Sequence, residues 1–211
     1  MNKKKVYFLI LTSLFSLLLI GYVVIIKYKL FVKENKIENN QNDKDNKVNS
    51  YNQYLANGIK FLGKGDAGDK NSYNLAIDEF QKAADISDNK VWLPYYNLGN
   101  TFRKIFDFNK AEVAYDQAIK ISGQSEGTLY IAKIEMFRYE LKKSDSEIRN
   151  IYKEAIENVY DNANLLVSYA AYLRDIGDYP EAIKYYELLL KKYPNNQLYI
   201  SEIKDLKSKI K

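Results

Sequence analysis

The side chains that most often carry out chemistry in proteins are missing from this chain. It has no histidine and no cysteine among its 211 residues. It therefore cannot build a histidine-based nucleophile triad, a cysteine protease site or the usual zinc sites. Paired acids remain at Asp175 and Asp178 and at Glu154 and Glu157, but solvated helix surface or helix caps explain these acids more simply. We expect a protein that is not an enzyme, with no catalytic residue, no cofactor and no metal.

A glycine-rich run, Gly63 to Lys70, has some of the composition of a phosphate-binding loop. In such loops glycine directly precedes a lysine, serine or threonine directly follows it, and a β-strand comes before the loop. Here Asp69 separates Gly68 from Lys70, and no serine or threonine follows directly. The run also lacks the Asp-x-Asp-x-Asp-Gly pattern of calcium loops. It predicts a loop that joins two helices.

The positive charge of the chain is concentrated at its N-terminus. The net charge is +5, but residues 1–33 hold six lysines and no acidic residue, which leaves 26 basic and 27 acidic side chains in the remainder. Proteins that bind nucleic acid through its phosphates usually carry a basic patch or a strongly basic domain. We therefore expect no nucleic-acid partner.

Small and aromatic residues recur at spacings that pack two short antiparallel helices against each other. One set is Leu98, Gly99, Phe102, Ala111, Tyr115 and Ala118. A second set lies 71 residues later and comprises Ala170, Leu173, Ala182, Tyr186 and Pro194. The connecting turns also correspond, as Asp107 to Ala111 and Asp178 to Ala182. Such a repeat predicts a stack of similar units that share a continuous core.

These residues resemble the tetratricopeptide repeat family, whose 34-residue unit has the pattern W-x2-L-G-x2-Y…A-x3-F…P. Residues 92–125 follow this pattern with Gly123 where a proline is usual, and residues 163–196 are a weaker copy with Leu189 at the second alanine position. Between them we expect a degenerate unit, 129–162, with a first helix over about 129–143 that has Met136 where glycine is expected. A capping box at Ser144 to Glu147 predicts the start of its second helix.

An upstream unit is expected over residues 51–88, with Gly63 to Ser72 as its connecting loop. Its first helix would carry Tyr54, Gly58 and Phe61, and its second Ala76, Phe80 and Ala83. The segment 197–211 would cap the last repeat with a polar outer face. The resemblance thus implies an all-α fold, a right-handed α-solenoid of about four helix pairs with a C-terminal capping helix, over residues 51–211.

An uncharged and mostly apolar stretch, Val6 to Ile26, dominates residues 1–33. A helix of 21 residues is about 30 Å long, which is enough to cross a bilayer core. Its C-terminal part, Ile20 to Val23, offers no Ala-x-Ala-like cleavage site. We expect an uncleaved, single-pass membrane anchor with its span over residues 6–26.

Lysines on both sides of this span leave its orientation undecided by charge alone, with Lys3, Lys4 and Lys5 before it and Lys27, Lys29 and Lys33 after it. A very short lysine-rich tail usually stays in the cytoplasm. We therefore expect a bacterial cytoplasmic membrane protein whose repeat domain is extracytoplasmic.

Residues 34–50 are rich in asparagine and lysine, with Ile37 and Val48 as their only large apolar side chains. Such a composition buries too little surface to offset the entropy of ordering, so we expect a flexible polar linker. A helix that continues from the anchor is the alternative.

The resemblance also implies a groove, because certain first-helix positions of each repeat usually face the concave side of the stack. The candidate partner-binding residues at these positions are Leu93, Tyr96, Asn100, Arg103, Tyr130, Lys133, Phe137 and Arg174. The same positions also include Glu140, Asn164, Val167 and Ala171. A mixture of aromatic, amide and cationic groups suits an extended peptide.

The sequence is compatible with two functions. In the first, the protein is a membrane-tethered, non-catalytic interaction module that binds a protein or peptide partner in its groove. In the second, it is a structural or assembly subunit of a larger cell-envelope complex. The sequence leaves the oligomeric state and the identity of the partner open.

Overall fold

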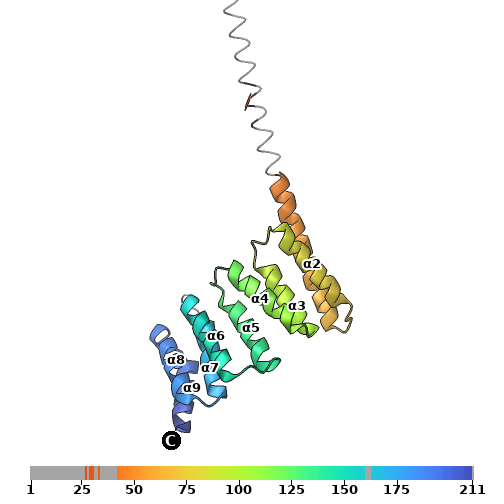
Figure 1. Ribbon diagram of the computed structural model, residues 1–211. Helices are drawn as coiled ribbons and strands as arrows, with labels where there is room; N and C mark the ends of the chain where they lie inside the picture. The colour runs from red at the N-terminus through yellow and green to blue at the C-terminus, as the bar shows by residue number, and fades with distance from the viewer. Residues whose placement is uncertain (1–26, 28, 31–32, 34–41, 160–162, 211) are drawn as a thin grey trace, which may run out of the picture. The chain divides into compact units, whose positions relative to one another are not determined.

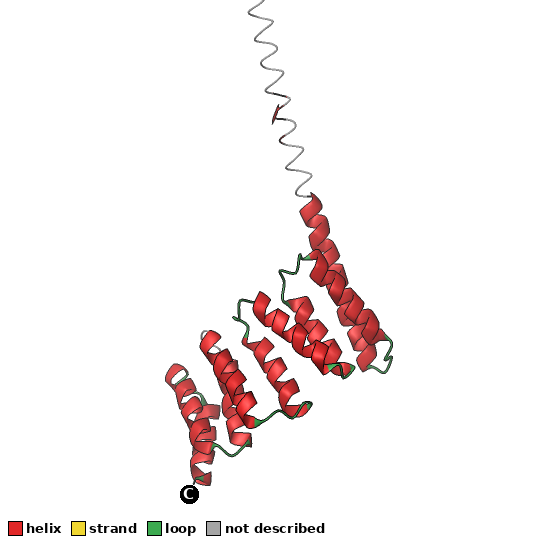
Figure 2. Cartoon of the chain, in the orientation of Figure 1, coloured by secondary structure: helices red, strands yellow, loops and turns green. Residues whose placement is uncertain are grey.

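The computed structural model describes residues 27, 29–30, 33, 42–159 and 163–210. All regular secondary structure in these residues is helical (Figure 2). The chain divides into two compact units, Met1–Asn49 and Ser50–Lys211. The predicted membrane span, 6–26, lies outside the described residues, and no described helix is both long and apolar enough to cross a bilayer.

The linker prediction is wrong for residues 42–50, which are helical, while residues 34–41 lie outside the described part of the chain. Almost all of these helical side chains are exposed, so burial does not order them. Asp43 precedes Lys47 by four residues, a spacing at which opposite charges support an isolated helix. The linker prediction considered only how much surface this segment could bury, so it left out this local charge pair.

Helix pairs stack along the second unit (Figure 1). Residues 50–66 are helical and precede α2 (Ser72–Ile86), so the predicted loop from Gly63 is shorter than expected. The remaining helices are α3 (Leu93–Lys104), α4 (Phe108–Ile121), α5 (Gly127–Tyr139), α6 (Asp145–Asn158), α7 (Ala163–Asp175), α8 (Tyr179–Lys192) and α9 (Gln197–Lys209). Each helix packs against its neighbours in sequence, and α5 also packs against α7. The first helices α5 and α7 therefore lie beside each other in the stack.

Helices α3 and α4 approach each other closely at Gly99. A Cβ atom built on Gly99 would lie 2.6 Å from Cε1 of Tyr115, which is fully buried. Gly58 meets Phe80 in the same way, at 2.5 Å. The small-against-aromatic packing expected from the repeat pattern is thus present twice. In α5 the equivalent position holds the fully buried Met136, and α5 packs less extensively against α6.

Side-chain caps mark the N-terminal ends of α4, α6 and α8. Ser144 Oγ accepts a hydrogen bond from the backbone N–H of Glu147, and Glu147 Oε2 accepts one from the N–H of Ser144. This is the predicted capping box, which satisfies two backbone donors at the start of α6. Asp107 and Asp178 cap α4 and α8 through the N–H groups of Lys110 and Glu181.

Helix α9 completes the stack on α8, where it buries Tyr199, Ile203 and Leu206. Lys204 and Lys207 stand 34 residues after Ala170 and Leu173, the positions that face a second helix in the preceding unit. Charges at these positions give α9 the polar face predicted for a cap. Leu198 and Ile200 remain exposed beside them.

A stack of tyrosine rings fills the core between α6 and α7. Tyr152 lies 4.6 Å from Tyr169 and 5.5 Å from Tyr172 between ring centroids, and the Arg138 guanidinium lies 4.7 Å from the ring centre of Tyr172. All three rings are almost completely buried. Such contacts stabilise the core beyond the apolar area they bury.

Candidate functional site

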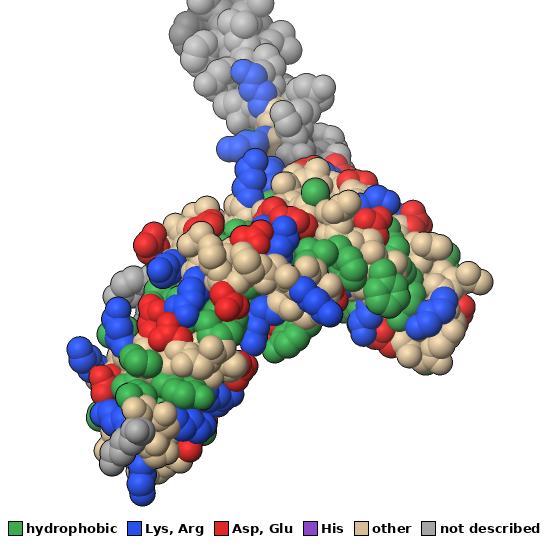
Figure 3. Space-filling view, turned by 60° about the horizontal axis from the view of Figure 1, so that its bottom comes forward, with side chains coloured by type: hydrophobic (Ala, Val, Ile, Leu, Met, Phe, Trp, Pro, Cys, Tyr) green, Lys and Arg blue, Asp and Glu red, His purple; other side chains and the backbone are tan. Residues whose placement is uncertain are grey.

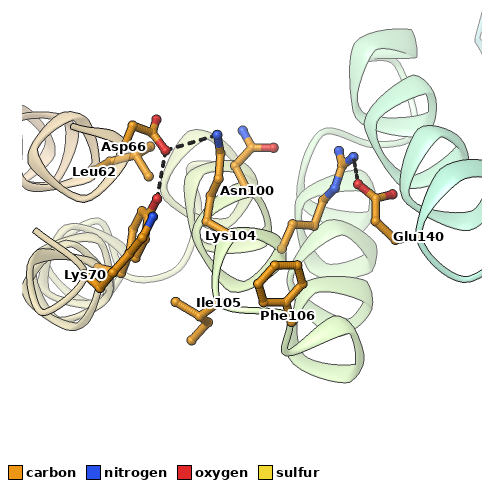
Figure 4. A pocket seen from close by; sticks show the side chains of 10 residues that line it. Leu62, Asp66, Lys70, Asn100, Lys104, Ile105, Phe106 and Glu140 are labelled. Atoms are coloured by element: carbon orange, nitrogen blue, oxygen red, sulfur yellow. Dashed lines mark hydrogen bonds and ion pairs between the residues drawn. The ribbon is translucent and has the colours of Figure 1, made fainter. Parts of the chain in front are cut away.

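The repeat unit has a cleft of about 1080 Å³ between residues 62–73, the C-terminal half of α3 and its following turn, and Glu140. Figure 3 brings the lower edge of the stack in Figure 1 forward and shows hydrophobic patches interspersed with lysines, arginines and acids. Figure 4 shows the cleft from close by, with polar and apolar side chains from several segments turned toward one space. This mixture makes it the best candidate for a binding site.

One wall of the cleft carries an acidic group whose negative charge is balanced by a lysine. Asp66 forms an ion pair with Lys104 at 3.0 Å and accepts a hydrogen bond of 2.9 Å from the Tyr73 hydroxyl (Figure 4). The hydrogen bond from Lys104 is the main cause that lowers the pKa of Asp66, and the Tyr73 hydroxyl adds to it, whereas partial burial opposes it. Asp66 therefore stays ionised and holds Lys104 at the rim of the cleft.

The opposite wall is held by Arg103. Its guanidinium pairs with Glu140 at 2.6 Å and donates a longer hydrogen bond, 3.4 Å, to the backbone carbonyl of Ala132. Equivalent pairs follow along the stack, from Arg138 to Asp175 at 3.1 Å and from Arg174 to Glu202 at 3.1 Å. Each of these arginines links one first helix to the next. Arg103 and Arg174 therefore have a structural role besides any contact with a partner.

Asn100 offers a hydrogen-bond donor to the cleft. Its Oδ1 accepts a hydrogen bond of 2.7 Å from the hydroxyl of the buried Tyr115. Its Nδ2 makes no hydrogen bond to any residue that the structure describes. Because Tyr115 fixes the orientation of the amide, the Nδ2 donor is already oriented on a residue that lines the cleft (Figure 4).

The structure brings only part of the predicted groove together. Asn100 and Arg103 line the cleft. Leu93 and Tyr96 are half-buried one or two turns earlier on α3, with the Tyr96 ring 6.3 Å from those of Trp92 and Tyr115. Arg174, on α7, does not line the cleft.

The predicted groove positions of the degenerate unit are wrong in part. Tyr130 and Phe137 are 2% and 6% exposed, so they belong to the core and offer no surface to a partner. Lys133 pairs with Asp116 of α4 at 2.7 Å, which places this face of α5 against a second helix. Helix α5 begins at Gly127, earlier than predicted, so the register of the family could not be carried over.

Several lining residues were not among the predicted site residues, namely Leu62, Asp66, Lys70, Lys104, Ile105 and Phe106. Three of them lie in or beside the glycine-rich run, which the sequence presented only as a connecting loop. A comparison of the two repeats could have pointed to Phe106, because Gly177 stands 71 residues later at the same place in the turn and the two residues differ.

Residues 94–125 and 163–202 each match a family model described as tetratricopeptide repeat. The chain therefore contains tetratricopeptide repeats. They coincide with α3 and α4, and with α7, α8 and the start of α9. Tetratricopeptide repeats generally serve as protein–protein interaction modules and are generally not enzymes.

Solved structures with the same fold have little sequence identity to this chain. One, described as a functional characterisation of Pseudomonas aeruginosa pilF, is 17% identical, with a TM-score of 0.55, and the match covers 78% of this chain and 70% of that one. The crystal structure of MamA protein is also 17% identical, with a TM-score of 0.51 and coverage of 74% and 80%. A search of curated proteins found no match. These similarities establish the repeat fold alone.

Proposed function

We propose that the protein is a non-catalytic interaction module that binds an extended peptide segment of a protein partner in the cleft beside α3. The observation that carries the proposal is the Asn100 amide, whose Oδ1 is fixed by Tyr115 while its Nδ2 lies unpaired among the described residues, at the cleft. An oriented amide donor suits a peptide carbonyl or a carboxylate. The apolar Leu62 and Ile105 beside it add contact area for side chains.

We further propose that residues 6–26 tether this module to a bacterial cytoplasmic membrane, with the repeats on the extracytoplasmic side. The support is the uncharged stretch of 21 residues and the short lysine-rich tail before it. A tether of this kind would hold the cleft near the membrane, where the module would recruit its partner.

The Asn100→Asp variant tests the proposal. Aspartate keeps an oxygen to accept the Tyr115 hydrogen bond, but it replaces the free N–H donor with an acceptor and adds a negative charge. A peptide selected from a phage-displayed random library against the full-length protein in detergent should bind this variant at least about tenfold more weakly, the usual effect of losing an important contact. Calorimetry would measure the affinity, and the melting temperature should change little.

Asn150→Asp is the matched control, because it places the same charge on an exposed position of the second helix α6. It should leave the affinity unchanged. Equal affinity of the selected peptides for both variants and the wild type would contradict peptide binding in the cleft. A library that yields no binder would contradict it as well. Either result would favour the assembly-subunit function.

A further inference from the structure

Phe106 is an exposed aromatic residue in a backbone conformation that bulky residues rarely adopt. Its φ is 62° and its side chain is 78% exposed. It follows α3, where the N–H of Asp107 donates to the carbonyl of Phe102 at 2.9 Å. In this type of helix end, the residue at the position of Phe106 is left-handed and is usually glycine.

The same turn in the last repeat uses glycine. Gly177 has φ 81°, and the N–H of Asp178 donates to the carbonyl of Leu173 at 2.9 Å, as in the earlier turn. Two turns of one geometry therefore differ in this residue. A left-handed conformation is unfavourable for phenylalanine and free of strain for glycine, so folding alone gives no reason for Phe106.

The Phe106 side chain lies where a ligand in the cleft would reach it. It lines the cleft together with Ile105, and it also borders a smaller hollow of about 370 Å³ that Phe108 and Leu141 help to line. Its ring contacts Phe108 edge-on, with 6.2 Å between the centroids. Ile105 and Phe106 are thus apolar side chains that line the cleft (Figure 4).

One cation of the cleft has no carboxylate within ion-pair distance among the described residues. Asp66 is paired with Lys104 and Glu140 with Arg103. Lys70, in contrast, makes a contact of 3.5 Å with the carbonyl of Gly65 and lies over the Tyr73 ring. It interacts with the charge of Asp66 at longer range, but no carboxylate of the described residues lies within ion-pair distance of its Nζ. The cleft therefore has a surplus positive charge that a carboxylate of the partner would complement.

From these two features we infer that Phe106 anchors a large apolar side chain of the bound peptide, and that a carboxylate of the same peptide pairs with Lys70. The inference rests on the proposed function, since it names the chemistry of the peptide that the cleft takes. A rigid aromatic ring at the edge of a polar hollow gives contact area with little loss of side-chain entropy. The partner segment is thus an acidic peptide with an aromatic or large aliphatic residue.

The Phe106→Gly variant separates binding from folding, because the two should change in opposite directions. The melting temperature should rise by a few degrees, since glycine relieves the left-handed conformation. The affinity for the library-selected peptide, measured on the full-length protein, should fall at least about tenfold. Lys70→Gln should reduce the affinity only for peptides that contain an acidic residue.

Gln124→Gly is the matched control. Gln124 is exposed, has φ 63° and lies in the turn between α4 and α5, away from the residues that line the cleft. The Gln124→Gly variant should be more stable than the wild type and should bind the library-selected peptide with the same affinity. Unchanged affinity of Phe106→Gly for a peptide that Asn100→Asp has lost would overturn this inference and leave the proposed function standing. Unchanged affinity in both variants, or a library without a binder, would overturn both.

Discussion

Replacing Gly99 with leucine is expected to destabilise the repeat unit by about 2–3 kcal/mol, the usual effect of overpacking a core. A Cβ at this position would lie 2.6 Å from one ring carbon of Tyr115 and 2.7 Å from another. Tyr115 cannot easily move away, because it is fully buried and its hydroxyl is hydrogen-bonded to Asn100. Urea or thermal unfolding would measure the change.

Gly63→Leu provides the control for this substitution. Gly63 is also helical, but it is exposed and a Cβ there would meet nothing within 4 Å. Leucine has the higher helix propensity, so this variant should be as stable as the wild type or slightly more stable. Equal stability of Gly99→Leu and Gly63→Leu would mean that α3 and α4 do not approach each other at Gly99.

Alkaline pH is expected to destabilise the protein, because its buried tyrosines ionise more readily in the unfolded chain than in the folded one. Burial is the main cause that raises the pKa of Tyr115 and Tyr169 to about 12, and it also raises the pKa values of Tyr152, Tyr172 and Tyr186. In the unfolded chain tyrosine titrates near pH 10. The stabilisation from keeping these hydroxyls protonated is therefore complete below about pH 10 and is lost as the pH rises toward about 12.

Each such tyrosine can remove up to about 1.4 kcal/mol of stability per pH unit in this window. Urea unfolding at a series of pH values, with tyrosinate absorbance recorded in parallel, would follow the loss. Tyr169→Phe removes one titrating group and should make the decline shallower. A stability that stays constant up to pH 11 would show that these rings are accessible to water.

The fold was largely predictable because it depends on local pairs that the sequence displays. Gly99 with Tyr115, and the Asp caps of α4 and α8, fix a helix pair within a short stretch of chain. The degenerate repeat was harder, since Met136 in place of glycine removes the marker of the close contact and with it the register of α5. Tyr130 and Phe137 were assigned to the surface for this reason, although they are buried.

The candidate site was less predictable because it is assembled from segments that differ between repeats. Asn100 and Arg103 follow from the repeat register, whereas Asp66, at the end of a helix, and Lys70, in the turn after it, come from a segment without a counterpart in the other units. The Arg103 pair with Glu140 also depends on how the next repeat is placed, which no pattern within one unit specifies. Local spacing thus predicts the scaffold better than the contacts across it.

Hydrogen exchange of the full-length protein, with and without the library-selected peptide, tests most directly whether the cleft beside α3 is the binding site. Residues 62–70 and the C-terminal half of α3 line the cleft, so their backbone amides should exchange more slowly with the peptide bound. The second helices α6 and α8 should exchange at the same rate in both states. Slower exchange confined to these second helices, or no change in residues 62–70 and α3, would contradict the account.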